Sequence, residues 1–149
     1  MSKIAVVYWS GTGNTESMAD AVAQGAKGKG AEVKLFTPDS FNSSMVDEFD
    51  AIAFGCPAMG AEELEESEFE PMFSDCESKL GGKKIALFGS YGWGGGEGEK
   101  TKTPGEWMRT WEATCRGDGA SVVSEPVICN EAPDDSALDE CKALGAALV

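Results

Sequence analysis

The sequence predicts a doubly wound α/β fold, in which helices cover both faces of a parallel β-sheet. Three short segments, residues 3–8, 51–56 and 84–90, are rich in apolar residues without alternation. Such runs are typical of strands that are buried on both faces, as in a parallel sheet. After these segments apolar residues recur every three or four positions, which is the period of a helix. Alternating strands and helices predict right-handed crossovers between parallel strands.

The strands can be assigned in chain order. Residues 3–8 (KIAVVY), 51–56 (AIAFGC) and 84–90 (KIALFGS) are the clear candidates, and residues 32–36 (EVKLF) and 121–130 are weaker ones. Pro126 interrupts the last of these segments.

Four apolar stripes predict the helices. In chain order they are Met18, Ala21, Val22 and Gly25; Phe69, Met72, Phe73, Cys76 and Leu80; Trp107, Met108, Trp111 and Cys115; and Leu138, Cys141, Leu144 and Leu148. Pro71 places a helix start near Glu70. Residues 103–106 (TPGE) have the pattern of a capping box with proline at the first helical position, so another helix is expected to begin there.

Composition excludes several functions. The 149 residues contain 12 Lys and Arg against 26 Asp and Glu, and no His, which gives a net charge of −14. Such a chain has no basic face for nucleic acid or for an anionic membrane, and chemistry that depends on histidine is excluded. We expect one domain over residues 1–149, without a targeting or membrane-spanning segment.

The five cysteines, at positions 56, 76, 115, 129 and 141, are isolated from one another. An odd number without C-x-x-C spacing suggests neither a disulfide framework nor a thiolate metal site, and a reducing cytoplasm is the expected location. Cys56 lies beside a candidate binding loop but has no neighbouring base. We expect it to be a small buried apolar residue and not a redox group.

Ligands of doubly wound sheets bind at the carboxyl ends of the strands, so the loops after residues 8, 56 and 90 are candidate sites. Residues 10–15 (SGTGNT) offer hydroxyl groups, glycines and a helix N-terminus, which a monophosphate requires. They lack the lysine of a nucleoside-triphosphate loop and the third glycine of a dinucleotide fingerprint. A polar N-capping turn is the alternative interpretation.

The other two loops are less specific by themselves. Residues 56–63 (CPAMGAEE) place a methionine before a glycine, which is also compatible with a plain surface loop. Residues 90–94 (SYGWG) place a tryptophan between glycines, and stacking on a flat ligand is a natural use of such a residue. A partly buried tryptophan that covers the domain is the alternative.

Together the three loops resemble those of the flavodoxins, specifically the short-chain type of anaerobic bacteria. Residues 8–16 (YWSGTGNTE) resemble the phosphate loop, residues 55–66 the first flavin loop and residues 87–94 the second. The resemblance extends over essentially the whole chain, including residues 68–71 and 130–134. It implies a five-stranded parallel sheet of order 2-1-3-4-5 with helices on both faces, and flavin mononucleotide (FMN) as the cofactor.

The resemblance also implies roles for particular residues. The hydroxyls of Ser10, Thr12 and Thr15 hold the phosphate, with Ser90 as a further hydroxyl, and the flavin ring lies between Met59 and Trp93. Glu62 matches the carboxylate that pairs with the flavin N3 edge, and Gly60 matches the residue whose carbonyl accepts the N5–H of the neutral semiquinone. The implied cofactor-binding residues are Trp9, Ser10, Gly11, Thr12, Gly13, Asn14, Thr15, Pro57, Ala58, Met59, Gly60, Ala61, Glu62, Ser90, Tyr91, Gly92, Trp93 and Gly94, and no catalytic or metal-binding residue is implied.

Charge near the flavin loop predicts the redox behaviour. Eight acidic residues and no basic one lie between positions 62 and 77: Glu62, Glu63, Glu65, Glu66, Glu68, Glu70, Asp75 and Glu77. At an effective dielectric constant of about 20, each uncompensated charge about 10 Å away disfavours an anionic flavin by about 1.7 kcal/mol. We therefore expect a monomeric one-electron carrier of low potential, which shuttles between semiquinone and hydroquinone and docks basic-patched redox proteins at the flavin edge.

Two other functions share this fold. One is an FMN-dependent reductase that passes electrons from NAD(P)H to quinones or small acceptors, and the other is an activator of one dedicated enzyme. Residues 95–104 (GGEGEKTKTP) also form an insertion of about nine residues relative to short-chain flavodoxins. It is either a plain surface loop or a segment that partly covers Trp93 or alters the choice of partner. Pro57 and Ala61 stand at positions that are often polar in relatives, so side-chain contacts with FMN are not expected from them.

Overall fold

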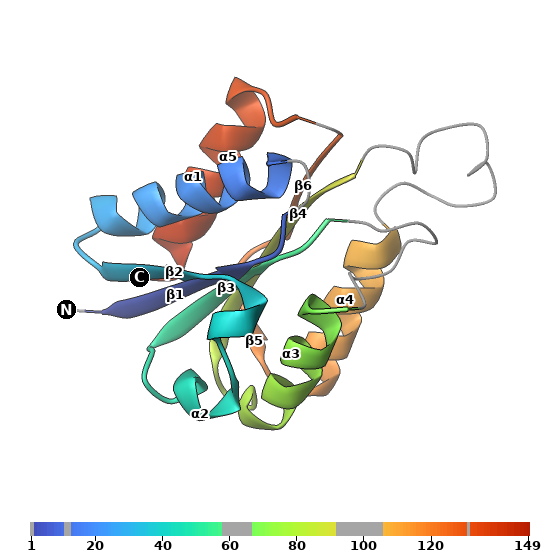
Figure 1. The fold of residues 1–149 in the computed structure, drawn as a ribbon. Coiled ribbons are helices and arrows are strands. Elements are labelled where there is room, and N and C mark those ends of the chain that lie inside the picture. The colour runs from blue at the N-terminus through green and yellow to red at the C-terminus, as the bar shows by residue number, and fades with distance from the viewer. Residues whose placement is uncertain (1, 11–12, 58–66, 92–105, 131) are drawn as a thin grey trace.

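The computed structural model describes residues 2–10, 13–57, 67–91, 106–130 and 132–149, whose arrangement is shown in Figure 1. Within these residues a parallel sheet is formed by β1 (Lys3–Tyr8), β2 (Glu32–Phe36), β3 (Ala51–Gly55), β4 (Lys84–Tyr91), β5 (Ser121–Val122) and β6 (Val127–Asn130). The strand order is β2-β1-β3-β4-β5, and β6 also pairs with β4. The doubly wound class and the predicted strand order are therefore confirmed.

The predicted fifth strand is in fact two strands, so five strands become six. β5 pairs with the start of β4, where Ser121 faces Lys84, and β6 pairs with its end, where Val127 faces Phe88. Six positions separate Ser121 from Val127, but only four separate their partners, so two residues are in excess. Pro126 lies in the break and has no N–H to donate to β4, which explains why the ladder stops there.

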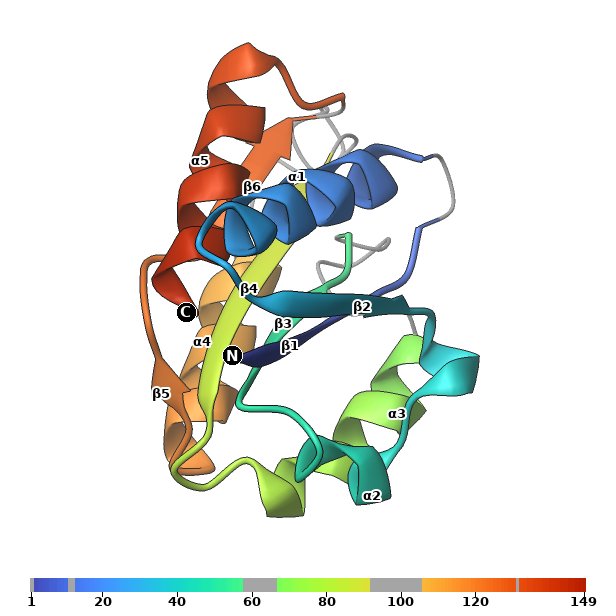
Figure 2. The same ribbon diagram turned by 90° about the vertical axis from the view of Figure 1, so that its left-hand side faces the viewer.

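Helices cover both faces of the sheet (Figures 1 and 2). α1 (Asn14–Gly28) and α5 (Asp135–Ala147) lie on one face, and α3 (Phe69–Cys76) and α4 (Glu106–Gly117) lie on the other. The four predicted helical stripes are confirmed, since almost all of their residues are buried. The start of α3 at Phe69 agrees with the expected start near Glu70. α4 begins at Glu106, and the predicted capping residues before it lie outside the described residues.

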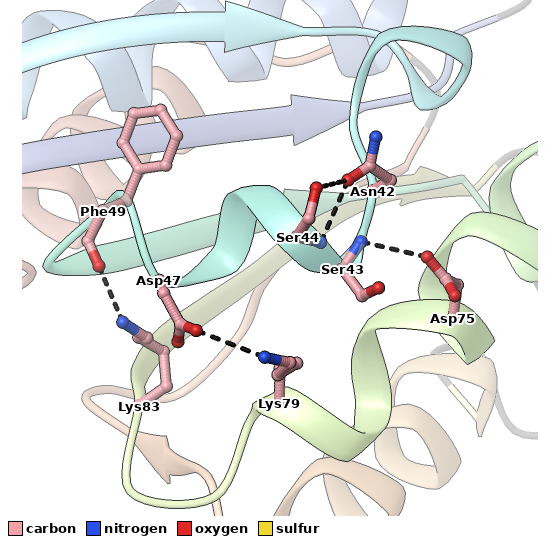
Figure 3. A network of polar contacts seen from close by, with 8 residues as sticks. All are labelled: Asn42, Ser43, Ser44, Asp47, Phe49, Asp75, Lys79 and Lys83. Carbon is pink, nitrogen blue, oxygen red and sulfur yellow. Dashed lines mark hydrogen bonds and ion pairs between the residues drawn. The ribbon is translucent and has the colours of Figure 1, made fainter.

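The connection between β2 and β3 contains only short helical segments. These are the 3₁₀ turn η1 (Pro38–Ser40) and the single-turn helix α2 (Ser43–Val46), whereas η2 (Glu77–Lys79) extends α3. Figure 3 shows how α2 is held: the N–H of Ser43 donates to Asp75 Oδ2 at 3.0 Å, and Lys79 pairs with Asp47 at 3.3 Å. Polar contacts with the α3–η2 segment thus add to the burial of Val46, the one fully buried residue of α2.

The two cores differ in the size of their side chains. Beneath α3 and α4 the core is aromatic, and Trp111 meets Phe69 and Phe73 edge to face with ring centroids 5.4 and 5.6 Å apart. Between α1 and α5 small residues dominate. A Cβ on Gly25 would collide with the carbonyl of Lys142, and one on Gly145 would collide with the carbonyl of Val22. These two glycines therefore allow the backbones of α1 and α5 to pack directly against each other.

Candidate cofactor site

The first candidate loop joins β1 to the N-terminus of α1. Gly13 is the N-cap and has a φ of 94°, a left-handed conformation that glycine adopts without a steric penalty. The hydroxyl of Ser10 accepts hydrogen bonds from the N–H groups of Gly13 and Glu16, at 3.0 and 3.3 Å. Ser10 thus acts as a cap of α1 in this structure, as the alternative interpretation of a polar capping turn foresaw. In the described part of the chain, the N–H groups of Asn14 and Thr15 have no hydrogen-bond acceptor.

Two buried hydroxyl groups lie beside this helix terminus. Thr15 and Ser90 are 1% and 5% exposed, and their Oγ atoms are 3.1 Å apart. Thr15 belongs to the first turn of α1 and Ser90 to the carboxyl end of β4. One proton serves the bond between them, so the pair keeps a second proton that it can donate to a ligand. The expected contribution of Ser90 beside the first loop is therefore matched by its position.

The second candidate loop follows β3, and its root is well anchored. The N–H of Cys56 donates to the carbonyl of Phe88, and the carbonyl of Cys56 accepts from Trp107 Nε1, both at 3.1 Å. A Cβ on Gly89 would collide with this same carbonyl, so the close approach of the two strands at this point requires glycine. Cys56 itself is fully buried, which confirms its assignment as a small core residue.

Trp107 and Glu68 have contacts here that the sequence does not reveal. Trp107 was expected only to fill the core, and the one available signal was that a buried indole N–H requires an acceptor. Glu68 Oε1 accepts a hydrogen bond from Trp9 Nε1 at 3.0 Å. The N–H of Trp9 also donates to the carbonyl of Gly55 at 3.0 Å, which extends the pairing of β1 with β3 by one residue.

The described site residues all lie at or beside the carboxyl ends of β1, β3 and β4, as predicted. They are Trp9, Ser10, Gly13, Asn14, Thr15, Pro57, Ser90 and Tyr91. The other predicted site residues, together with the insertion at 95–104, lie outside the described residues: Gly11, Thr12, Ala58, Met59, Gly60, Ala61, Glu62, Gly92, Trp93 and Gly94.

The carboxylate of Glu77 has a raised pKa. Burial, together with the adjacent Asp118 carboxylate, raises the pKa of Glu77 to about 7. Glu77 is therefore partly protonated at neutral pH. It follows the last turn of α3, about 12 Å along the helix from Phe69 at the loop end. Glu77 therefore adds less negative charge than predicted, so the charge expected near the flavin from all eight acids is too large.

The thiols outside the second loop are unreactive. Burial is the main reason that the pKa values of Cys76, Cys115 and Cys141 are raised to about 12, and that of Cys129 to about 11. These groups remain protonated thiols at neutral pH and do not serve as nucleophiles. Among the described residues, no group of three potential ligands suited to a metal ion is found. No helix among them has the length and apolar character needed to cross a membrane.

Free N–H groups at a helix terminus, two buried hydroxyls and a carboxyl edge of a doubly wound sheet suit the phosphate of a mononucleotide. The fold and these described residues thus define a nucleotide-binding protein of the doubly wound class.

Comparison with known proteins identifies the family. The flavodoxin family model matches residues 6–145. A flavodoxin of Megasphaera elsdenii is 46% identical over 144 residues, which cover 97% of this chain and 96% of the relative. A flavodoxin of Clostridium beijerinckii is 44% identical over 134 residues, which cover 90% of this chain and 91% of the relative. The chain therefore belongs to the flavodoxin family.

Structural similarity agrees with this assignment. The solution structure of two-electron reduced Megasphaera elsdenii flavodoxin has a TM-score of 0.84, and the alignment covers 97% of each chain. Flavodoxins bind FMN and carry electrons, so this chain is an FMN-binding electron carrier. When bound, FMN supplies the electron transfer, and the residues around it tune its affinity and potential.

Proposed function

We propose that the protein carries single electrons at low potential between other redox proteins, without catalysing a reaction on a small substrate. The observation that carries this proposal is the uncharged phosphate end of the site. Ser10, Thr15 and Ser90 supply hydroxyls, Asn14 and Thr15 supply N–H groups, and residues 10–15 contain no Lys or Arg. A phosphate held in this way keeps its negative charge, which disfavours a second electron on the ring.

The acidic segment acts in the same direction. Residues 62–70 contain six acids and no base: Glu62, Glu63, Glu65, Glu66, Glu68 and Glu70. Of these, Glu68 stands beside Trp9 at the edge of the site. Glu77 is partly protonated at neutral pH, so it adds less negative charge than the six acids of residues 62–70.

Residue roles follow from the family pattern. Residues 10–15 and Ser90 would hold the phosphate, and Met59 and Trp93 would stack on the two faces of the flavin ring. Glu62 is the partner proposed for the N3 edge, and Gly60 is the residue proposed to accept from N5–H. The remaining residues of the two flavin loops would line the ring.

The electron-transfer partners are redox proteins with a basic patch, which the net charge of −14 attracts toward the flavin edge. The protein works as a monomer and as one domain over residues 1–149. Its five cysteines, all among the described residues, form no disulfide, which suits the reducing cytoplasm. A reductase would also need a place for a nicotinamide donor, and the flavin loops contain no basic residue to receive one.

Two measurements test the proposal. A spectroelectrochemical titration of the purified FMN complex is expected to resolve two one-electron steps, the second at clearly lower potential. A single two-electron step would overturn it. The same complex mixed with NAD(P)H alone is expected to leave the nicotinamide unoxidised, whereas sustained turnover with a quinone would establish the reductase instead.

A further inference from the structure

One hydrogen bond joins the roots of two binding loops. Trp9 immediately precedes the phosphate loop, and Glu68 is the N-cap of α3, just after the segment that contains Met59 and Glu62. The indole Nε1 of Trp9 donates to Glu68 Oε1 at 3.0 Å, across 59 positions of sequence. The residue before the first loop and the start of α3 are thus tied to each other by a contact that involves no ligand.

The main chain and the ring of Trp9 are both held in place, so the direction of its indole N–H is fixed. The N–H of Trp9 is bonded to the carbonyl of Gly55, at the end of β3, so its main chain is fixed against the sheet. Its ring packs against the aromatic core on the side of α3 and α4. An indole is a donor only, so the position of its Nε1 determines where the carboxylate of Glu68 must lie.

The carboxylate of Glu68 does not cap α3, although Glu68 occupies the N-cap position. It bonds to Trp9 instead, while its charge still lies at the positive end of the helix dipole. Two favourable interactions therefore hold the same carboxylate at the start of α3. A displacement of Glu68 would carry with it the chain that ends the first flavin loop.

We propose that Glu68 is a positioning residue for the cofactor site, which through Trp9 fixes the start of the phosphate loop against the start of α3 in the apoprotein. This inference rests on the proposed FMN site. Fixing these two ends reduces the ordering that a ligand must bring about, so the contact increases affinity.

Four variants separate positioning from charge. Trp9→Phe removes the donor and keeps the carboxylate, whereas Glu68→Gln keeps an acceptor oxygen and removes the charge. Glu68→Ala removes both, and the double variant Trp9→Phe/Glu68→Ala tests whether the two residues act as one unit. Glu70→Gln, two positions after the N-cap Glu68 on the same helix, is the control for a lost acidic charge.

Affinity is measured by titrating the apoprotein with FMN and following the quenching of flavin fluorescence. Trp9→Phe and Glu68→Ala are expected to weaken binding by about tenfold each, and the double variant no further, because one shared contact is lost. Glu68→Gln and Glu70→Gln are expected to stay within about threefold of the wild type. Additive losses in the double variant, or unchanged affinity of Trp9→Phe, would overturn the proposal.

Two further readouts separate positioning from charge and from misfolding. In the apoprotein, the indole N–H resonance of Trp9 is expected to move in Glu68→Ala and to stay near its wild-type position in Glu70→Gln. In the FMN complexes, Glu68→Gln is expected to raise the second midpoint potential by more than Trp9→Phe, which removes no charge; equal shifts in the two variants would overturn the separation. Failure of the wild-type protein to bind FMN would overturn the proposed function itself, whereas wild-type binding with unaffected variants would overturn only the coupling of the loops.

Discussion

The hydroxyls of Thr15 and Ser90 lie 3.1 Å apart in the interior of the protein, although 75 positions separate them in the sequence. One stands on the first turn of α1 and the other at the end of β4. Each is the buried partner of the other, so neither loses its hydrogen bond when the site holds no ligand. The interior polar pair is thus compatible with a stable apoprotein and with a further hydrogen bond to a phosphate.

Thr15→Val should separate the two roles of this pair. The substitution keeps the volume of the side chain but leaves the Ser90 hydroxyl buried without its partner. We expect the apoprotein to lose about 1–2 kcal/mol of unfolding free energy, measured with urea, and FMN binding to weaken by at least about tenfold. The double variant Thr15→Val/Ser90→Ala should recover part of the apoprotein stability but none of the affinity. Unchanged FMN affinity in both variants would contradict a role in phosphate binding.

The stability of the protein should depend on pH through Glu77. Its pKa is raised to about 7 in the folded protein, from an ordinary value of 4.5, so the folded state binds the proton more tightly than the unfolded state. This group therefore stabilises the fold fully below about pH 4.5, and the contribution is lost as the pH rises through about 7. In Glu77→Gln, the urea midpoint should fall less between pH 5 and pH 8 than in the wild type. Parallel profiles for the two proteins would show that Glu77 has no part in the pH dependence.

Gly145→Ala should destabilise the contact between α1 and α5. The new methyl group would collide with the carbonyl of Val22 and force the two helices apart, at a cost of about 1–3 kcal/mol. Gly28→Ala, at the end of α1, is the matched control because its Cβ would have open space. That variant should be neutral or more stable by up to about 1 kcal/mol, since alanine favours a helix. Equal thermal midpoints for the two variants would contradict close packing at Gly145.

Two buried tryptophans on α4 provide another matched pair. Trp107 Nε1 donates to the carbonyl of Cys56, whereas Trp111 Nε1 has no hydrogen-bond partner among the described residues. Replacement of each by Phe removes a similar volume, but only Trp107→Phe removes a hydrogen bond, the one to the carbonyl of Cys56. We expect Trp107→Phe to be more destabilising than Trp111→Phe by about 1–2 kcal/mol in urea unfolding. The opposite order would mean that packing of the indole ring outweighs its hydrogen bond.

Pattern and local chemistry were sufficient for the long elements of the fold. The apolar period located α1, α3, α4 and α5, and uninterrupted apolar runs located β1, β3 and β4, because burial on one or both faces leaves a direct trace in the sequence. The single turn α2 is too short to leave an apolar stripe: Val46 is its one buried residue, and the N–H of Ser43 and the carboxylate of Asp47 also fix it to α3 and η2. Pro126 marked the break in the fifth strand, but the two-residue excess depends on the pairing with β4 and is not encoded locally.

The same distinction applies to the site. Hydroxyls, glycines and a helix N-terminus predict a phosphate loop, because an anion needs those groups close together in sequence. The bond of Thr15 to Ser90 and that of Trp9 to Glu68 join distant segments, and their geometry follows from the strand order. The hydroxyl of Ser10 accepts from two N–H groups at the start of α1 and keeps its own proton to donate, so its role at a phosphate stays a prediction.

The contact between Tyr91 and Trp107 affects how well this chain tolerates changes in the length of the segment between them. Their ring centroids are 5.9 Å apart, so the end of β4 and the start of α4 are already held together where the connecting segment leaves and returns. Lengthening a segment between two fixed ends costs only about 0.6 kcal/mol for each doubling of its length. The part of this connection that follows Gly94 is therefore expected to tolerate changes in length, while the flavin loop before it and the scaffold stay the same.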